Sequence, residues 1–371
     1  MNSVIDSLLA DIESRQVTDS NRYYPAGLFP TIRSNGLLGY QRHDSNIYFS
    51  ALIALTLLDL LPHLTGPQQQ RILKLTGRVT TLFPRFRSTR HPSLYNFYQR
   101  NPPAHYPNGF FLSKLKHFEL ADDADDTCML SLVLQRVGQL NSNDVEQIRE
   151  QLIEFSNQKR KCIQSSLPVY QNLKAYSVWF GSGKMPVEFD LCVLTNILCF
   201  VIRNRFEFNE QDLDSFAYIR LAIQNGDIEQ RPFHISYTYP DPVVMYYHIA
   251  RLYAELPDAE QYLPGDLIIR RLQDLSASTA SGLKRILLST SLLRMGAGVP
   301  DVSWTMDTLK ADMKTLGFFI APMLKGTTHF LLNRFAHWPL FQIRFDCEAY
   351  YLALVLEYEV LRSRPKINNM V

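Results

Sequence analysis

The stretch D-D-A-D-D-T-C-M occupies residues 122–129 and stands directly before the apolar run 129–134. Its four carboxylates lie within five positions, and ionising all of them is costly unless solvent or a metal compensates. Acidic residues are favoured at a helix N-terminus, so a solvated helix start is one interpretation. The other is a site that keeps one carboxyl protonated for use as an acid. Both interpretations predict that an internal helix begins here and runs to about Val137.

Five further segments have the character of internal helices, and the first, 50–61, is apolar on nearly every face. We expect the six internal helices to begin near Asp44, Asp126, Asp190, Asp241, Ser276 and Asp346. The aspartates other than Asp126 are most simply helix caps, because a carboxylate accepts hydrogen bonds from the free N–H groups of a first turn. Ser276 or Ser278 is the expected cap of the remaining helix.

Amphipathic segments alternate with these internal helices. There are six of them, at 3–13, 66–83, 143–156, 210–224, 258–274 and 301–316, with Asn143 or Asp144 as the expected cap of the third. Such alternation predicts stacked helix pairs that close on themselves. Six pairs is the number that closes, which favours an all-α (α/α)6 toroid, as a single domain 1–371, over an open solenoid. Strand signals are sparse, because no sustained alternating run is bounded by hairpin turns.

Two long connections, about 84–125 and 161–187, lead into the same rim of the predicted toroid. Alternating helices place every internal-helix N-terminus on that rim. Long structured loops at one end of a rigid barrel usually build the functional site. We therefore expect the site at the rim where the acidic stretch lies.

Composition narrows the classes of protein. The formal net charge of +2 gives no electrostatic reason to expect a nucleic-acid partner. The five scattered cysteines form no CxxC pair and fit buried thiols in a reducing compartment. The N-terminal stretch 1–16 is not a signal peptide, and no apolar run is long enough for a spanning helix. We expect a cytoplasmic protein without a spanning segment, and peripheral membrane contact stays open.

The residues Asp123-Ala124-Asp125-Asp126-Thr127 match the DxDDT motif of class II terpene cyclases, of the squalene-hopene and copalyl-diphosphate type, and the chain resembles that family here. Cys128-Met129 continues the motif in a similar way. The resemblance implies an α-barrel of double helices. It also implies that the middle aspartate, Asp125, protonates an alkene or epoxide, with Asp123 and Asp126 as supporting carboxylates. The chain also looks like uncharacterised bacterial toroid proteins with a similar acidic motif.

The chain departs from that family in several respects. Class II cyclases usually have a second helical domain, whereas this chain has room for one barrel, and QxxDGSW-like repeats are absent from the sequence. Asp122, Asp123 and Asp126 also spell DDxxD, a metal-binding motif of class I synthases, but no motif of NSE type accompanies it. We expect no cofactor, with Mg²⁺ entering only if the substrate is a diphosphate.

Protonating a carbon–carbon double bond requires a neutral carboxyl in a dry pocket, and the resulting carbocation is stabilised by π faces. Most aromatic residues serve packing, so the candidates are those near the predicted rim. With two carboxylates that face the cluster across the mouth, the residues expected to bind an apolar isoprenoid substrate are Trp179, Tyr239, Tyr350, Tyr176, Phe180, Glu188 and Asp190.

Other polar residues are weaker candidates. A lone histidine is more often structural than functional, but four could orient the acid: His43, His105, His117 and His234. Arg42, Lys184 and Arg231 could hold a diphosphate, although a solvated surface charge is the simpler interpretation of each. No set of His and Cys has zinc-ligand spacing, and no G-x-S-x-G elbow is present.

Three functions remain open from the sequence. The first is proton-initiated cyclisation of a linear isoprenoid with Asp125 as the acid. The second is a carbohydrate-active (α/α)6 enzyme with Asp125 and Glu188 as an acid/base pair, which two carboxyls about 5–10 Å apart in an open cleft would favour. The third is a non-catalytic toroid that binds an apolar ligand or a protein partner, which an acidic cluster salt-bridged to Arg42 or Arg344 would favour.

Overall fold

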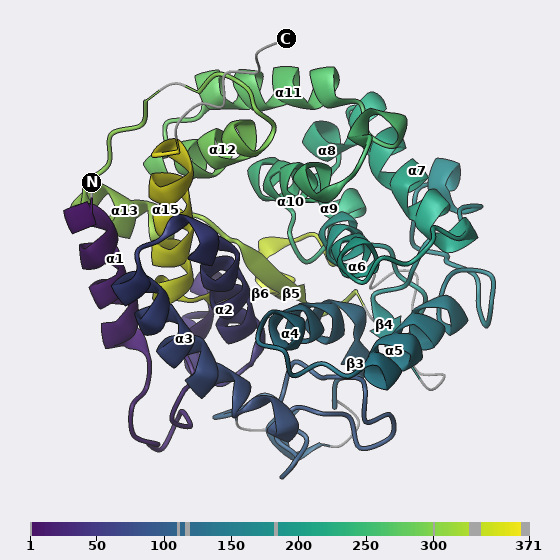
Figure 1. Cartoon of the computed structure of the whole chain (residues 1–371). Coiled ribbons are helices and arrows are strands. Elements are labelled where there is room, and N and C mark those ends of the chain that lie inside the picture. The colour runs from purple at the N-terminus through teal and green to yellow at the C-terminus, as the bar shows by residue number, and fades with distance from the viewer. Residues whose placement is uncertain are drawn as a thin grey trace.

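The computed structural model describes residues 2–109, 112–115, 119–181, 185–299, 301–325 and 335–364. Six helices in this part of the chain form an inner ring: α2 (Tyr48–Leu60), α4 (Ala124–Arg136), α6 (Leu191–Arg203), α10 (Pro242–Glu255), α12 (Gly282–Arg294) and α15 (Glu348–Arg362). Each packs against the next in chain order, and α15 packs against α2, so the ring closes (Figure 1).

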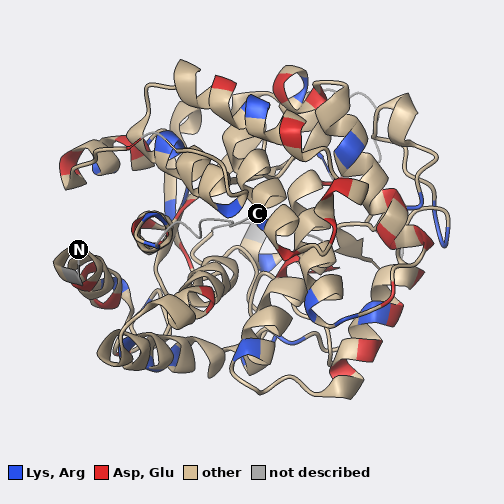
Figure 2. Cartoon of the chain, turned by 45° about the horizontal axis from the view of Figure 1, so that its top comes forward, with Lys and Arg blue, Asp and Glu red and all other residues tan. Residues whose placement is uncertain are grey.

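A second set of helices lies outside this ring (Figure 1). These are α1 (Asn2–Arg15), α3 (Gly66–Thr80), α5 (Ser142–Glu154), α7 (Glu210–Gln224), α11 (Gly265–Ser278) and α13 (Met306–Met313). Each packs against an inner helix. The order of inner and outer helices follows the predicted alternation. Lys and Arg are interspersed with Asp and Glu around the molecule (Figure 2), as the small net charge requires.

The inner helices form the core because their side chains are buried on every face. In α2 the buried positions include Ser50 as well as the apolar residues, and in α4 every residue from Ala124 to Leu134 is buried. A helix surrounded by protein must be apolar all round or satisfy its polar groups internally. The acidic residues of α4 are therefore interior groups, not the solvated helix start that the sequence also allowed.

The all-α prediction needs one correction, a small antiparallel sheet. Its order is β2 (Tyr40–Asp44), β1 (Thr31–Asn35), β6 (Gln342–Asp346) and β5 (Phe319–Pro322). In Figure 1 its strands β5 and β6 lie across the opening of the ring. A second sheet pairs β3 (Asp122–Asp123) with β4 (Trp179–Phe180). Two short helices, α8 (Asp227–Gln230) and α9 (Pro232–Ile235), connect α7 to α10.

The strand β1 escaped prediction because its buried face is polar. Thr31, Arg33 and Asn35 point inward, and Ile32 lies on the more exposed face. Arg33 can be buried there because its guanidinium pairs with Asp44 at 2.5 Å and its Nε donates to the Tyr40 hydroxyl. Hydrophobic alternation reports a strand only when the buried face is apolar.

The expected helix caps are correct for two of the internal helices. Asp190 caps α6, and Asp241 caps α10, each accepting hydrogen bonds from first-turn N–H groups. Asp44 and Asp346 do not cap, because they pair instead with Arg33 and Arg344.

The remaining cap predictions are also corrected. Helix α12 begins after Ser281, whose hydroxyl accepts from the Lys284 N–H, while Ser276 and Ser278 belong to α11. Asn141, not Asn143 or Asp144, caps α5. None of the described helices has both the length and the apolar character needed to cross a membrane.

Candidate functional site

The acidic stretch divides into residues with different tasks. Asp123 is the N-cap of α4, and its carboxylate accepts a hydrogen bond from the Asp126 N–H at 2.7 Å. Asp122 accepts from the Ser88 hydroxyl at 2.5 Å and from the Asn96 amide at 3.2 Å. Asp123 thus serves as the cap of α4, and Asp122 holds the loop that carries Ser88 and Asn96.

Asp125 has a different environment, because it lies inside the first turn of α4 and both of its oxygens accept hydrogen bonds from other inner helices or their connections. The amide of Asn196, on α6, donates to Oδ1 at 2.5 Å. The hydroxyl of Tyr239, just before α10, donates to Oδ2 at 2.5 Å. The Tyr239 oxygen is in turn hydrogen-bonded to the Tyr48 hydroxyl on α2. Four segments of the ring therefore converge on one carboxyl group.

Arg251 on α10 extends this network. Its guanidinium donates to the Asn196 carbonyl oxygen, which orients the Asn196 amide so that its NH₂ group faces Asp125. The Arg251 side chain is buried, and its Nε has no hydrogen-bond partner. Charged side chains are rarely buried unless a carboxylate pairs with them. Here the Arg251 guanidinium contacts the Asn196 amide, which in turn donates a hydrogen bond to the Asp125 carboxyl.

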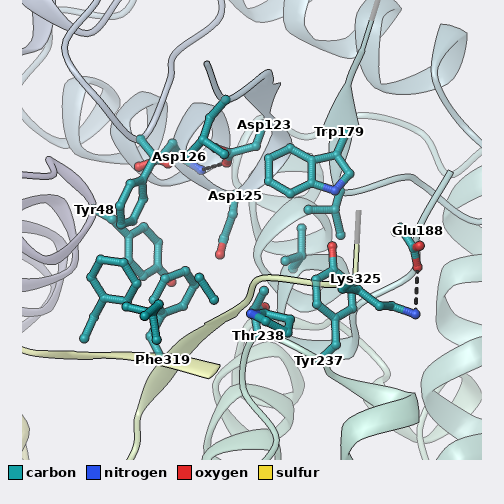
Figure 3. A pocket seen from close by; sticks show the side chains of 18 of the residues that line it. Tyr48, Asp123, Asp125, Asp126, Trp179, Glu188, Tyr237, Thr238, Phe319 and Lys325 are labelled. Atoms are coloured by element: carbon teal, nitrogen blue, oxygen red, sulfur yellow. Dashed lines mark hydrogen bonds and ion pairs between the residues drawn. The ribbon is translucent and has the colours of Figure 1, made fainter. Parts of the chain in front are cut away.

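A cavity of about 200 Å³ opens beside Asp125. Its lining is mostly apolar, and the aromatic residues among it are Tyr48, Phe97, Tyr98, Tyr106, Trp179, Tyr237, Phe319 and Phe345. Figure 3 shows the Asp125 carboxyl projecting into the space between the Tyr48 and Phe319 side and the Trp179 side. Phe319, on β5, has its ring centroid 5.2 Å from that of Tyr239 and 5.4 Å from that of Tyr48.

Burial makes these carboxyl groups weak acids by ordinary standards. Desolvation raises the pKa of Asp125 to about 6, against the opposing effect of the hydrogen bonds from Tyr239 and Asn196. Desolvation also raises the pKa of Asp123 to about 7, and the charges of its aspartate neighbours add to the rise. The pKa of Asp126 is raised well above its usual range by burial and by Asp123. Near neutral pH the cluster therefore retains protons.

A second polar group lies on the other side of the cavity (Figure 3). Glu188 is buried, accepts from the Ser165 hydroxyl at 2.5 Å and pairs with Lys325 at 3.2 Å. The Lys325 ammonium also lies 5.3 Å from the centre of the Tyr237 ring. Burial raises the pKa of Glu188, while the positive charge of Lys325 opposes the rise. This ion pair is the charged part of a wall that is otherwise aromatic and aliphatic.

The structure brings part of the predicted site together. Asp123, Asp125, Asp126, Trp179 and Glu188 all line the cavity. The β3–β4 pairing sets Trp179 opposite Asp123, which explains how residues far apart in sequence share one wall. Tyr239 stands behind Asp125 as its hydrogen-bond donor.

Four predicted substrate-binding residues lie elsewhere, each for a structural reason. The Tyr176 hydroxyl is held by Asp212 and Arg149 between α5 and α7. Phe180 packs against Phe155 at the end of α5.

The other two are absent from the cavity lining as well. Tyr350 on α15 packs against the Phe318 ring at 4.8 Å. Asp190 caps α6 and also accepts hydrogen bonds from the Ser236 and Thr238 hydroxyls. Proximity to a helix start in the sequence does not fix the direction of a side chain, and this is why these residues were misplaced.

The weaker candidates do not reach Asp125 either. His43 stacks on Tyr23, and His105 bonds to the Leu115 carbonyl oxygen. Arg231 lies within ion-pair distance of Asp227. His234 and Arg42 are absent from the cavity lining. His117 and Lys184 lie outside the described residues.

Sequence analysis missed several residues of the site. Asn196 and Arg251 are buried polar residues within largely apolar helices, and that contrast is the signal that could have drawn attention to them. His248, on α10, is also buried, with its Nε2 unpartnered and its pKa lowered to about 3 by burial and by Arg251. Phe319 and Lys325 come from β5 and the turn after it, which sequence analysis did not recognise as structure.

Among the described residues, no group of three or more His, Cys, Asp and Glu side chains could hold a metal ion. The DDxxD spelling of Asp122, Asp123 and Asp126 does not become a common face, because Asp122 is bonded to Ser88 and Asn96 and is absent from the cavity lining.

Comparison with known proteins adds evidence on the fold. No protein-family model matches the sequence, and no curated protein matches it. Solved structures do match. A protein from Actinoplanes is similar with a TM-score of 0.55 at 11% identity, over 98% of this chain and 100% of that one.

The fold is also similar to that of solved type II terpene cyclases. The type II terpene cyclase MstE from Scytonema matches with a TM-score of 0.52 at 11% identity, over 96% of this chain and 97% of MstE. A variant of MstE in complex with its product, merosterolic acid A, matches with a TM-score of 0.50 at 13% identity, over 96% of both chains. The match spans nearly all of that cyclase chain, so a second helical domain is no requirement of this fold.

Proposed function

We propose that this protein is a type II terpene-cyclase-like enzyme, built as an (α/α)6 toroid, in which Asp125 starts the cyclisation of a linear isoprenoid by protonating it. The observation that carries the proposal is the buried Asp125 carboxyl, which projects into an aromatic-lined cavity and is held on both oxygens. The similarity of the fold to MstE supports it. Type II terpene cyclases are proton-initiated and need no cofactor, and the proposal requires none.

The first step transfers the Asp125 proton to a double bond or an epoxide oxygen of the substrate. The electron pair of the double bond forms the new C–H bond, or the C–O bond of the epoxide breaks, and a carbocation remains. Further double bonds then attack it and form ring C–C bonds, until loss of a proton ends the sequence. The hydrogen bonds from Asn196 and Tyr239 stabilise the Asp125 carboxylate left behind.

The cavity wall suits the cation that follows. The rings of Tyr48, Phe319 and Trp179 surround the Asp125 carboxyl, and aromatic faces attract positive charge. An apolar wall also excludes water, which would otherwise trap the cation. The role proposed for Asp123 and Asp126 is to keep this end of the cavity rich in protons, as their raised pKa values indicate.

The same cavity argues against a carbohydrate-active enzyme. Glu188 is occupied by Lys325 and Ser165, and sugar-binding clefts require many more polar groups than this wall offers. An ion pair between the acidic cluster and Arg344 would have favoured a non-catalytic toroid, but Arg344 pairs with Asp346 instead.

The test is product formation from linear isoprenoids, supplied as free alcohols, epoxides, aryl conjugates and diphosphates. We expect a cyclic product from at least one class. Asp125→Asn should lower the rate by about 10²-fold or more, the scale of lost general acid catalysis. Asp122→Asn is the matched control, because it makes the same change three positions away, outside the cavity. Full activity of Asp125→Asn, or an equal loss in both variants, would refute the proposal.

A further inference from the structure

Two polar atoms on one wall of the cavity have no hydrogen-bond partner in the part of the chain that the structure describes. The first is the buried hydroxyl of Tyr237. The second is Oε1 of Glu188, because the Ser165 hydroxyl and the Lys325 ammonium both contact Oε2. A buried polar group without a partner costs free energy, so such atoms on a cavity wall indicate a ligand that pairs with them.

Glu188, Tyr237 and Lys325 lie together on the side of the cavity away from Tyr48 and Phe319 (Figure 3), and we call these three residues the polar end of the cavity. The Lys325 ammonium joins them, because it pairs with Glu188 at 3.2 Å and lies 5.3 Å from the centre of the Tyr237 ring. Burial raises the pKa of Tyr237, and the charge of Glu188 raises it further, as expected for near neighbours.

The charge of the polar end is already balanced. Glu188 is 2% exposed, and its negative charge is paired with the Lys325 ammonium. An ion pair of this kind offers no net charge to a ligand. A phosphate or diphosphate would lie beside a buried carboxylate, where like charges repel strongly because the surroundings are apolar. A neutral ligand group meets no such repulsion.

The polar end offers one donor and one acceptor to such a neutral group. The Tyr237 hydroxyl can donate a hydrogen bond, and Oε1 of an ionised Glu188 can only accept one. A hydroxyl group matches this pair, because it accepts one hydrogen bond and donates another. An ether oxygen has no proton to donate, and a diphosphate offers acceptors only.

We propose that the polar end of the cavity binds a free hydroxyl group, so that the substrate is a linear isoprenoid alcohol or a prenylated phenol and not a diphosphate. The hydroxyl donates to Glu188 Oε1 and accepts from Tyr237. The chain then extends past Trp179, which lets a double bond further along reach Asp125. This inference rests on the proposed function, because it assigns the substrate of the same site.

Equilibrium binding to the Asp125→Asn variant tests the inference without turnover. The probes are linear isoprenoids of matched and increasing chain length that carry a free hydroxyl, a methyl ether, a diphosphate or a phenol. We expect the better of the alcohol and the phenol to bind about tenfold more tightly than the methyl ether, which leaves Glu188 Oε1 unpaired. The diphosphate should bind more weakly still. The order of alcohol and phenol identifies the source of the hydroxyl.

Substitutions in the same background separate the two hydrogen bonds. Tyr237→Phe should weaken alcohol binding about tenfold without lowering the thermal midpoint, because the deleted hydroxyl has no partner in the described protein. Tyr246→Phe is the matched control, since the Tyr246 hydroxyl donates to Glu229 at 2.8 Å and Tyr246 is absent from the cavity lining. It should bind the alcohol unchanged. Glu188→Gln should reverse the preference, because Lys325 then has an unpaired charge for a diphosphate.

Three results would overturn the polar end as a hydroxyl site. These are tighter binding of the diphosphate than of the alcohol and the phenol, equal affinities for the alcohol and its methyl ether, and equal losses in Tyr237→Phe and Tyr246→Phe. Absence of binding by every probe would overturn it too. Failure of the proposed function is distinguishable, because the alcohol would then bind as expected while wild type formed no cyclic product. Cyclic product from the diphosphate alone would retain the proposed function and refute the hydroxyl site.

Discussion

The starts of α4 and α6 carry buried aspartates with different tasks. Asp190, before α6, accepts hydrogen bonds from the Cys192 and Val193 N–H groups, from the Ser236 hydroxyl, and from the hydroxyl and the N–H of Thr238. Both oxygens of the Asp190 carboxylate thus accept hydrogen bonds from donors in the protein. Asp125, in α4, accepts only from the Asn196 and Tyr239 side chains and lines a cavity.

This difference is the basis on which the proposed function assigns a structural role to Asp190 and a reactive one to Asp125. Burial raises the pKa of both, but the hydrogen bonds to Asp190 oppose that rise and fix the group as a cap. Asp125, whose pKa is raised to about 6, is protonated in mildly acidic solution and in a minor fraction at neutral pH, and it faces space in which a substrate can lie. Asp190 stands at the cap of its helix, whereas Asp125 lies inside the first turn of α4.

The largest difference between the two aspartates is expected when each is changed to asparagine in a separate variant. Asp190→Asn places an NH₂ group against the donors of Thr238 or Ser236 and should lower the free energy of unfolding by about 1–3 kcal/mol. Asp125→Asn should leave stability unchanged or slightly higher, because a neutral amide replaces a buried carboxyl. Chemical denaturation measures both. If Asp125→Asn were the more destabilising of the two, Asp125 would be the structural residue.

Arg251 sharpens the comparison, since it acts only on the Asp125 side. Its positive charge lowers the pKa of Asp125, so Arg251→Met should raise that pKa and leave a weaker acid. Because the protonated form is the active one, the alkaline limb of the pH–rate profile should move to higher pH, while the maximal rate falls by about tenfold.

Arg251→Lys retains the charge and should restore the wild-type pH limb in part. A loss of rate that is equal at every pH would instead indicate that Arg251 only supports the packing of α10 against α6.

A smaller effect is expected at the cap of α4. The pKa of Asp123 is 3.8 without perturbation and about 7 in the folded protein, so the folded state binds the proton more tightly. Stability from this group is then fully present below the unfolded pKa and is lost as pH rises through the folded one. Asp123→Asn keeps an N-cap acceptor but has no charge to acquire.

The variant should therefore unfold about 2–4 °C above wild type in mildly alkaline buffer, with the difference vanishing in acid. Differential scanning calorimetry across this pH range checks it. A variant less stable than wild type at every pH would show that the cap needs the negative charge.

More of the ring of helices than of the cavity wall could be predicted from the sequence. Alternating apolar and amphipathic segments predicted the order of the inner and outer helices, because burial on all faces leaves a clear record in composition. The bounds were less accurate, since α11 begins at Gly265 and α12 at Gly282, after the predicted 258 and Ser276. The walls depend on side chains that long connections and strands deliver. Phe319 and Lys325 could not be placed, because the sheet that carries them has polar residues on its buried face, such as Arg33.

The roles of the four aspartates in the acidic stretch could be predicted only in part, for a related reason. Its spelling pointed to Asp125, but capping by Asp123 and the attachment of Asp122 to Ser88 became visible only with the fold. Asn196 and Arg251 are buried polar residues in largely apolar helices, and their roles depend on contacts with another helix. Tyr176 and Tyr350 show the opposite failure, since each stands near a predicted helix start and faces a different part of the core.

The most direct test of the central claim is the origin of the hydrogen that starts the reaction. Turnover of a linear isoprenoid that is protonated at a double bond, not at an epoxide, in deuterium oxide should place one deuterium on a non-exchangeable carbon of the cyclic product, because Asp125 takes its proton from solvent between turnovers. Asp125→Asn should form no labelled product, while Asp122→Asn should form it as wild type does. A cyclic product without deuterium, or labelled product from Asp125→Asn, would contradict the assignment of Asp125 as the acid.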